Sequence, residues 1–335
     1  MSRSFITLAA LSIAVATTLI SLQAQAVQRT HVSAAFGSDA NTATNCAAAA
    51  PCRFFTAAMS VTDPNGEVIV LDSGGYGAVT ITQSVALIAP TGVYAGISVF
   101  PGADGVKIAT AGVNVVLRGL SINGQGGNDG INMTAGNRLT VENCVISNLG
   151  QNGILVNAAA TVRVTDSIVR DTGGSGITLQ NGVTATITRA VASGNANPGI
   201  YLLGNTPSTS TVDIADSTVD GNSSGIYALS DVTSANLKLS VRDSRIVHNS
   251  SFGLAAASNA GGAASLTASN NMVSNNTYGL AAQGAGAKVI STGNTVTGNT
   301  GVGFYNNNAV FVSAGNNTVY DNGGNFGTIT VIAAQ

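Results

Sequence analysis

The sequence contains no tryptophan, only three cysteines and six prolines, and charged residues make up 8% of its 335 positions. Three cysteines are too few for a small scaffold held together by disulfides. A hydrophobic share of 44% excludes a disordered chain, which needs low hydrophobicity and high net charge. The net charge of -2 leaves no basic surface that would attract nucleic acid. What remains is rich in Gly, Ala, Ser, Thr, Asn and Val, a composition typical of β-structure.

The first 26 residues have the features of an export signal. Arg3 precedes an apolar run from Phe5 to Leu22, and Ala24-Gln25-Ala26 offers the small residues that a signal peptidase recognises. An uncleaved membrane anchor is the alternative, which the threonines and serines within the run disfavour. We therefore expect residues 1–26 to be a cleaved signal peptide. The mature chain would be secreted, periplasmic or on the cell surface, with no membrane span.

Export permits disulfide bonds. Cys46 and Cys52 flank a short alanine-rich segment, and this spacing predicts a disulfide that closes a local loop. Cys144 lies far away in a periodic strand region, so we interpret it as a small buried side chain.

The chain repeats itself at intervals of 23 to 28 residues. A glycine followed by an apolar residue recurs at Gly130, Gly153, Gly176, Gly199, Gly225, Gly253, Gly279 and Gly303. A second apolar column is formed by Val141, Val164, Ile187, Ile214 and Val241. Three short strands per unit, separated by Gly, Asn and Asp turns, cannot bury an apolar face alone, but stacked units can.

A third column predicts a ladder of side-chain amides. Its apolar members are Val145, Ile168, Val191, Val219, Ile246, Val273, Val296 and Val319. Asn or Asp follows most of them after three residues, at Asn148, Asp171, Asn222, Asn249, Asn276, Asn299 and Asn322, with Asn195 one place later in its repeat. An amide at the same turn of every coil is expected to bond to the amide of the next coil.

The fold that satisfies these repeats is an all-β solenoid. Each strand pairs in parallel with its counterpart one turn away, about 4.8 Å along the axis. Leucine-rich repeats share the period but need leucine at most of these positions and often a helix per unit. A β-sandwich has no reason to repeat in register over this length.

The repeat units, such as Asn152-Gly153-Ile154-Leu155-Val156, resemble those of the right-handed parallel β-helix proteins of the pectate-lyase-like superfold, from about Val68 to Thr330. The entry segment is similar as well, with Gly37-Ser38-Asp39 and Pro51-Cys52-Arg53-Phe54. The resemblance implies a single right-handed parallel β-helix over residues 67–335. It also implies a cap over residues 27–66, with a short helix near Arg53 to Val61 that covers the open end.

This superfold hosts many activities, so the resemblance does not define a reaction. The Asn-Thr-Asp, Asp-Asp, Gly-His-Gly and Arg-Ile-Lys strings of its galacturonan hydrolases do not occur here. Neither do Asp-Pro-His-Asp of the alginate-epimerase relatives and Trp-Ile-Asp-His of the pectate lyases. The only histidines are His31 and His248, which excludes a histidine metal cluster. No glycine-rich phosphate loop leads into a helix, so a nucleotide cofactor is not expected.

Two features indicate a binding face. The outward column after each Gly-apolar pair reads Asn132, Leu155, Thr178, Tyr201, Tyr227, Ala255, Ala281 and Tyr305. Tyr201 and Tyr227 would occupy adjacent rungs, where they either bind the faces of sugar rings or stack on each other. Long connections in three consecutive coils, at 203–211, 229–238 and 257–265, predict a wall along one face. Neutral drift in tolerant loops is the alternative.

A charged column supplies the candidate catalytic residues. It reads Gly119, Asn143, Asp166, Arg189, Asp216, Asp243, Asn270 and Gly293. In a lyase, Arg189 would neutralise the carboxylate of a uronic acid, helped by Arg163, Lys238 and Arg242, while a carboxylate would remove the adjacent proton. Asp216 and Asp243 would form a carboxylate pair able to bind calcium. The competing interpretation is structural, because turns favour Asp and Asn and sheet surfaces carry alternating charges.

Two functional hypotheses remain. The favoured one is an exported, non-catalytic scaffold for adhesion or for binding a polysaccharide or cell-surface glycan. The alternative is a polysaccharide lyase or glycoside hydrolase acting on an acidic polysaccharide. The alternative requires that Asp166, Arg189, Asp216 and Asp243 converge on one cleft with Tyr201, Tyr227 and the long connections.

Overall fold

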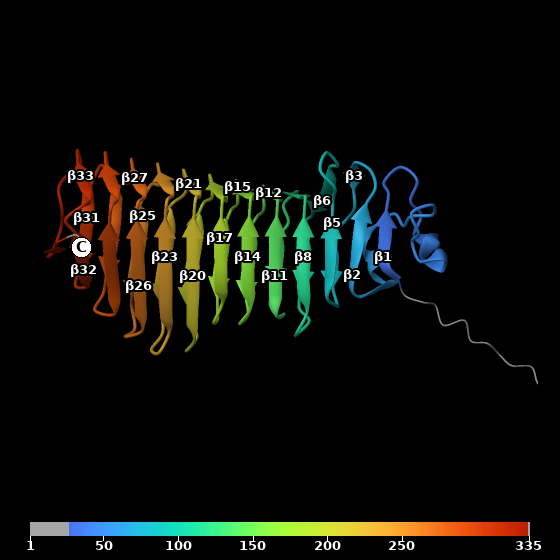
Figure 1. Ribbon diagram of the computed structural model, residues 1–335, viewed down its shortest axis with the longest axis horizontal. Coiled ribbons are helices and arrows are strands. Elements are labelled where there is room, and N and C mark those ends of the chain that lie inside the picture. The colour runs from blue at the N-terminus through green and yellow to red at the C-terminus, as the bar shows by residue number, and fades with distance from the viewer. Residues whose placement is uncertain (1–26, 334–335) are drawn as a thin grey trace, which may run out of the picture.

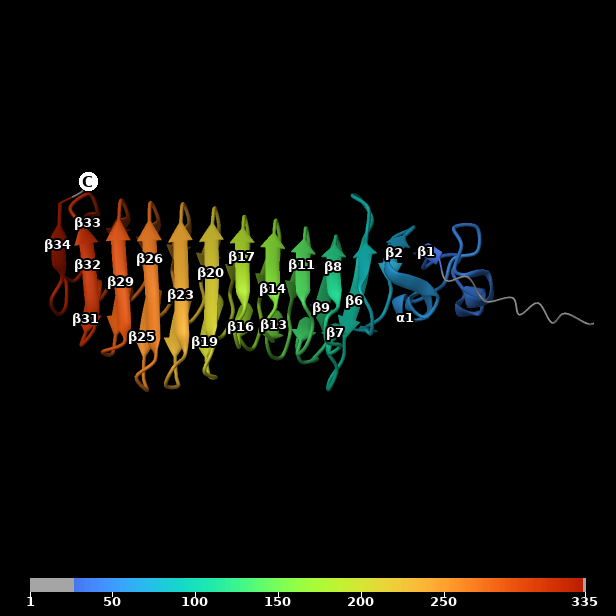
Figure 2. The ribbon, with the colours of Figure 1, turned by 60° about the horizontal axis from the view of Figure 1, so that its bottom comes forward.

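The computed structural model describes residues 27–333, which form three parallel β-sheets wound around one axis (Figures 1 and 2). The expected signal peptide lies outside these residues. Within them, no helix is long and apolar enough to cross a membrane. The chain passes through sheet A, sheet B and sheet C in turn, and each strand pairs with the strand one coil later.

Sheet A contains β1 (Val27–Val32), β2 (Thr62–Val70), β5 (Val85–Ile88), β8 (Asn114–Arg118), β11 (Arg138–Glu142), β14 (Thr161–Thr165), β17 (Thr184–Thr188), β20 (Thr209–Ala215), β23 (Asn236–Arg242), β26 (Ala263–Ser269), β29 (Ala287–Thr292), β32 (Val310–Ala314) and β34 (Thr330–Ile332). Sheet B contains β3 (Gly74–Gly75), β6 (Ala95–Val99), β9 (Leu120–Gly124), β12 (Val145–Ser147), β15 (Ile168–Arg170), β18 (Val191–Ser193), β21 (Thr218–Asp220), β24 (Arg245–Val247), β27 (Met272–Ser274), β30 (Thr295–Thr297) and β33 (Thr318–Tyr320). Sheet C contains β4 (Val79–Ile81), β7 (Val106–Ile108), β10 (Ile131–Met133), β13 (Ile154–Asn157), β16 (Ile177–Gln180), β19 (Ile200–Gly204), β22 (Ile226–Ser230), β25 (Phe252–Ser258), β28 (Tyr278–Gln283) and β31 (Val302–Asn307). We call the turns between sheets the A/B, B/C and C/A corners.

The core consists of apolar columns that run along the axis. The residues after the repeated glycines pair in register and are at most 3% exposed: Ile131, Ile154, Ile177, Ile200, Ile226, Leu254, Leu280 and Phe304. The column from Val141 to Val241 is in register and buried as well. The glycine is required by close packing, because a Cβ at Gly130 would lie 2.6 Å from the Gly153 carbonyl oxygen. Both expected columns are confirmed.

The third expected column is out of register by one residue. Val191 pairs with Thr218 and not with Val219. Accordingly, Ile168 faces outward and is 37% exposed, whereas its neighbour Val169 is fully buried. Since side chains alternate between the two faces of a strand, a slip of one residue moves a whole column to the other face. The predicted column was assembled from valine and isoleucine residues by type alone. It therefore combined an outward-facing column with an inward-facing one.

The amide ladder exists at the B/C corner. Its members are Asn195, Asn222, Asn249, Asn276, Asn299 and Asn322, and each Nδ2 donates to the next Oδ1 at 2.8–3.1 Å. The same Oδ1 accepts the backbone N–H of the preceding asparagine at 3.0 Å. Asn148 and Asp171 do not belong to it. They occupy the preceding position, where φ is positive (59° and 55°).

A second ladder lies at the A/B corner and was not predicted. Asn271 donates from Nδ2 to Asn294 at 3.0 Å, and Asn294 donates to Asn317 at 3.2 Å. In earlier coils serine hydroxyls take this position, as Ser244 does for the backbone N–H of Ser217. Both corners are therefore held from coil to coil by buried polar side chains.

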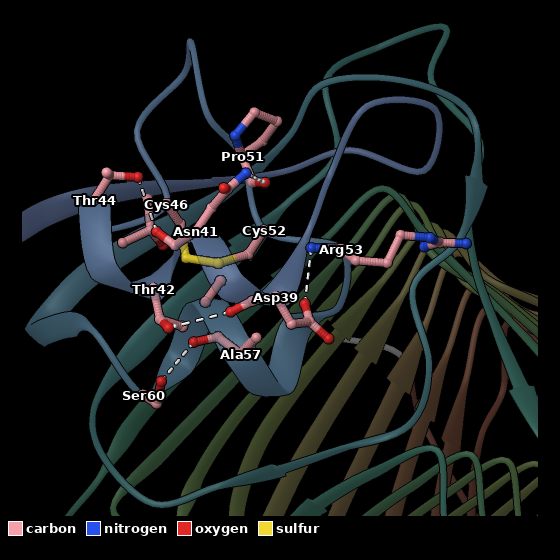
Figure 3. The surroundings of a disulfide bond; sticks show 12 residues. Asp39, Asn41, Thr42, Thr44, Cys46, Pro51, Cys52, Arg53, Ala57 and Ser60 are labelled. Atoms are coloured by element: carbon pink, nitrogen blue, oxygen red, sulfur yellow. Dashed lines mark hydrogen bonds between the residues drawn. A yellow bond between two sulfur atoms is a disulfide. The ribbon is translucent and has the colours of Figure 1, made fainter.

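The N-terminal end is covered by a short helix, α1 (Phe55–Met59), which packs against β1, β2 and β4. The expected disulfide joins Cys46 to Cys52 beside the 3-10 helix η1 (Asp39–Thr44) and near α1, as Figure 3 shows. Asp39 accepts the backbone N–H of Arg53 at 2.9 Å and so ties the loop to the start of α1. Cys144 is free and buried, as expected.

Asp72 anchors the first coil. Its carboxylate accepts hydrogen bonds from the Ser33 hydroxyl (2.6 Å), from the backbone N–H groups of Ala34 (2.6 Å) and Ala35 (3.1 Å), and from the Tyr76 hydroxyl. Desolvation raises the pKa of Asp72, but these hydrogen bonds outweigh it and lower the pKa to about 2. The ionised carboxylate thus fixes the chain between β1 and the cap.

We predict that Asn249→Ala lowers the free energy of unfolding by about 3 kcal/mol, because it leaves the buried N–H of Asn222 without an acceptor. Urea denaturation measures the change. Asn259→Ala is the control, since Asn259 bonds to Asp231 at the surface, and it should cost less than about 0.5 kcal/mol. Equal losses in the two variants would contradict a special role for the ladder.

We also predict an acid-sensitive cap. Since the pKa of Asp72 is lowered from 3.8 to about 2 in the folded protein, its stabilising effect is complete above pH 4 and is lost as the pH falls through 2. Amide exchange at Ala34 and Ala35 should therefore speed up in this window. Asp72→Asn should show fast exchange already at neutral pH and little further change on acidification. A pH profile shared by the wild type and the variant would refute the assignment.

Candidate functional site

The expected charged column lies at the A/B corner. Asp166, Arg189, Asp216 and Asp243 follow successive strands of sheet A, and all four have positive φ, between 50° and 52°. Gly, Asn and Asp tolerate this backbone conformation best. The corner geometry therefore accounts for the abundance of Asp and Asn in this column without any catalytic role.

Arg189 in the column and the adjacent Arg242 are already paired with carboxylates. Arg189 binds Asp166 through two hydrogen bonds of 2.6 and 2.8 Å, and this pairing lowers the pKa of Asp166 and raises that of Arg189. Arg242 contacts Asp243 at 3.1 Å. An arginine that is neutralised by a neighbouring carboxylate is poorly suited to bind the carboxylate of a uronic acid.

The Asp216 and Asp243 pair does not fit calcium. The two residues line a shallow depression of about 570 Å³ that Arg245 also lines. Between residues 27 and 333, no group of three or more His, Cys, Asp or Glu side chains is placed to hold a metal. Calcium needs six to eight oxygen ligands. We derive no chemistry through a metal here.

The remaining predicted residues lie on two other faces. Arg163 and Lys238 project from the outer face of sheet A, on β14 and β23, whereas Tyr201 and Tyr227 project from sheet C. In Figure 1 the strands of sheet A run from the C/A corner at the lower edge to the A/B corner at the upper edge. The seven residues of β20 alone separate these corners by about 20 Å. The convergence on one cleft that the lyase or hydrolase alternative requires is absent among the described residues, because a full strand lies between the charged column and the long connections.

About half of the residues in the long connections belong to strands. In the three coils concerned, β20, β23 and β26 have seven residues each, compared with five in β11, β14 and β17. The added residues extend the sheets toward the C/A corner, where the yellow and orange coils reach lower than the green ones in Figure 1. The extension therefore borders sheet C and its tyrosines, and not the charged column.

Tyr201 and Tyr227 do occupy adjacent rungs, and their rings stack on each other. The centroids are 5.8 Å apart and the planes differ by 10°. Burial raises the pKa of Tyr201 to about 12 and also raises that of Tyr227. The faces between the two rings are thus covered, and the pair is not a flat platform for two sugars. Both side chains are half-buried, and Thr178, on the rung before Tyr201, is 4% exposed.

The tyrosine pair is the start of a longer feature, which we call the aromatic row. It comprises Tyr201, Tyr227, Phe252, Tyr278, Tyr305 and Phe326, with successive centroids 5.0–6.1 Å apart. Phe252 and Tyr278 come from the position before the repeated glycine, and the outward positions of their strands hold the small residues Ala255 and Ala281. The row runs along the axis for about 24 Å, which is five spacings of about 4.8 Å.

Sequence reasoning missed Phe252 and Tyr278 because they do not share the column of Tyr201. Phe326 does share it, since it pairs with Tyr305, but its repeat lacks the Gly-apolar pair that marks the column. A signal for Phe252 and Tyr278 was present in the sequence. In these two repeats an aromatic residue precedes the glycine, and the outward position of the same strand holds alanine.

The other end of the sheet C face is polar. We call Asp104, Asp129, Asn132 and Asn152 the acidic end. Asp129 is 2% exposed, and its Oδ1 accepts the backbone N–H and the Nδ2 of Asn152 at 2.8 and 3.0 Å. Desolvation raises the pKa of Asp129, and the nearby charge of Asp104 adds to this. Asp104 lines a cavity of about 560 Å³ together with Lys107, Thr80 and Thr82.

Comparison with known proteins agrees with this architecture. The family model for the right-handed β-helix region matches residues 66–234, half of the chain, and the protein belongs to this family. Among solved structures, it is similar to the pectate lyase Pel9A, with a TM-score of 0.65 and 16% identity over 88% of this chain and 79% of that one. It is also similar to XylC in complex with xylose, with a TM-score of 0.55 and 10% identity over 81% of this chain and 69% of that one. At these identities the likeness shows the fold alone. The search of curated proteins returned no match.

We predict that Tyr201 resists ionisation. Because its pKa is raised from 10.0 to about 12, the absorbance difference between the wild type and Tyr201→Phe should show no phenolate signal at pH 10. The signal should appear only as the pH approaches 12. Half-ionisation near pH 10 would mean that the ring is open to water and that the row does not form as described.

Proposed function

We propose that this protein is an exported, non-catalytic scaffold that binds a polysaccharide along the outer face of sheet C. The aromatic row carries the proposal. It is a continuous line of half-buried rings and hydroxyls that runs parallel to the axis on the outer face of sheet C. Aromatic side chains bind the apolar faces of sugars, and tyrosine hydroxyls bond to sugar hydroxyls. Export is supported by the signal-like start of the sequence and is compatible with the Cys46–Cys52 disulfide.

The shape of the row indicates how the polymer lies. Its rungs follow one another without a gap, so an extended chain that lies along the axis meets a ring or hydroxyl at every rung. Tyr201 and Phe326 have no ring stacked on their outer faces among the described residues, and Phe326 is 50% exposed. These two ends are where a sugar can stack on an aromatic face. Between them, contacts are made by ring edges, by hydroxyls and by Tyr305, which is tilted by 54° from Tyr278.

The lyase or hydrolase alternative receives no such support. Its candidate residues are separated from the aromatic row by a sheet, and Asp166 and Arg189 satisfy each other. The acidic end holds a carboxyl with a raised pKa, Asp129, but its side chain is almost fully buried and is held by Asn152. Binding without turnover is the function that this geometry supports best.

We predict that Tyr201→Ala combined with Tyr227→Ala abolishes retention on an immobilised polysaccharide that the wild-type protein binds, because it removes the first two rungs of the row. Loss of two buried aromatic contacts should weaken binding by about 100-fold or more. The matched control is Asp166→Ala combined with Arg189→Ala, which changes two residues on the A/B corner and should bind normally.

Affinity electrophoresis on a panel of polysaccharides measures retention, and absorbance of unsaturated products monitors turnover in parallel. Loss of binding in the control variant together with normal binding in the tyrosine variant would refute the proposal. Product formation that disappears in the control variant would instead establish a lyase at the A/B corner.

A further inference from the structure

Given that sheet C binds a polysaccharide, we infer that its ligand is an uncharged polysaccharide and that the face discriminates against polymers carrying uronic acids. This inference rests on the proposed function and adds the class of polymer. It departs from the acidic substrate that the charged column had suggested.

The first observation is the distribution of charge over the sheet. The ten strands of sheet C carry one ionisable charge between them, Lys107 on β7. The seven strands from β13 to β31, which include the strands of the aromatic row, contain no Asp, Glu, Lys or Arg. A polymer with one carboxylate per sugar would lie against this face without a cation to pair with, and its carboxylates would be desolvated without compensation.

The polar groups that the face does offer suit hydroxyls. The outward ends of the strands hold the amides Asn157, Gln180, Gln283 and Asn307. Amides and hydroxyls both donate and accept, which is what a neutral sugar requires, since each sugar hydroxyl does the same. Together with the tyrosine hydroxyls they form a neutral, hydrogen-bonding surface.

Fixed charges near the face are mostly negative. Asp231 lies in the turn between β22 and β23, and its charge helps to raise the pKa of both Tyr201 and Tyr227. The influence of Asp231 therefore reaches the first two rungs of the row. At the acidic end, Asp104 and Asp129 lie on consecutive rungs, and the N–H of Asp129 contacts Asp104 at 3.3 Å. Carboxylates accept hydrogen bonds from sugar hydroxyls but repel anionic sugars.

Asn132 strengthens this picture. Its Nδ2 donates to Asp104 at 2.9 Å, whereas its Oδ1 is buried without a partner among residues 27–333. A buried carbonyl oxygen left without a donor is costly. A sugar hydroxyl that reaches the acidic end would supply the missing donor, and a carboxylate could not.

The cations that an acidic polymer needs are on another face. Arg138, Lys238 and Lys288 lie in one column on the outside of sheet A and form no ion pair in the described structure. Arg163 lies in the neighbouring column, and its Nε donates to the Thr165 hydroxyl at 3.3 Å. The protein thus separates its free cations from its aromatic row, and a polymer bound to the row does not meet them.

The test compares each neutral polysaccharide with its own oxidised form. A glucan, a xylan, a galactan and a mannan are used, and those with free primary hydroxyls are also presented after oxidation of these groups to carboxylates, so that linkage and backbone are unchanged. Affinities of the full mature protein are measured by affinity electrophoresis and calorimetry at low and high salt. We expect at least one neutral polymer to bind. Its oxidised form should bind at least about tenfold more weakly, and high salt should reduce this difference in affinity.

A charge reversal at the face provides the control. Asp231→Lys should improve binding of the oxidised polymer by about tenfold, whereas Asp213→Lys, an exposed aspartate on sheet A, should leave the preference unchanged. The inference would be overturned if the wild type bound the oxidised polymer more tightly than the neutral one and two further results held. The preference would have to persist in the double variant Tyr201→Ala with Tyr227→Ala and disappear in the double variant Arg163→Ala with Lys238→Ala. Such results would place the ligand on sheet A. If no polymer binds, the proposed function itself fails.

Discussion

Register between neighbouring coils is the constraint on which the rest of this molecule depends. Each strand obtains its backbone hydrogen bonds only from the coils before and after it, so every inward side chain must meet its counterpart at the same position. The two ladders enforce this. An asparagine at the B/C corner satisfies the backbone of the preceding coil and the amide of the next one, and it does so inside a core where an unpaired polar group would be costly.

The same constraint determines the surface. At the A/B corner of the eight coils from Gly119 to Gly293 one residue has positive φ, which favours Gly, Asn and Asp. The carboxylates of the charged column are therefore a by-product of how the coil turns. Side chains on the outer faces of the sheets are free of this requirement, and their chemistry is segregated: hydroxyls and free cations on sheet A, and rings and amides on sheet C. Function is better sought on those faces than at the corners.

Periodicity was sufficient to predict the parallel solenoid, the Gly-apolar column, the buried Cys144 and most of the B/C ladder. Periodicity failed where the type of a residue does not indicate whether its side chain faces the core or the solvent. Three apolar residues of the predicted third column face outward, namely Val145, Ile168 and Val191. Residue type alone places them in one column with Val219, which is buried. The pairing of Val191 with Thr218 shows that they belong to a different column. A pattern of residue types cannot show which face of a short, three-residue strand is buried when both faces carry apolar residues.

The candidate site was predicted only in part, for a geometric reason. The adjacency of Tyr201 and Tyr227 follows from their shared position in the repeat. Phe252 and Tyr278 start from a different position, and their rings join the row only because Ala255 and Ala281 occupy the outward positions of the same strands. Conversely, residues that looked close in a list of repeats, such as Arg189 and Tyr201, lie on separate sides of the coil.

The most direct test of the account is hydroxyl-radical footprinting of the protein with and without a neutral polysaccharide that it binds. This method reports the solvent exposure of individual side chains, and aromatic rings are among its best targets. The account predicts protection of Tyr201, Tyr227, Tyr278, Tyr305 and Phe326, with no change at Tyr94, an exposed ring outside sheet C. Protection confined to sheet A or to the A/B corner, with the aromatic row unchanged, would contradict it.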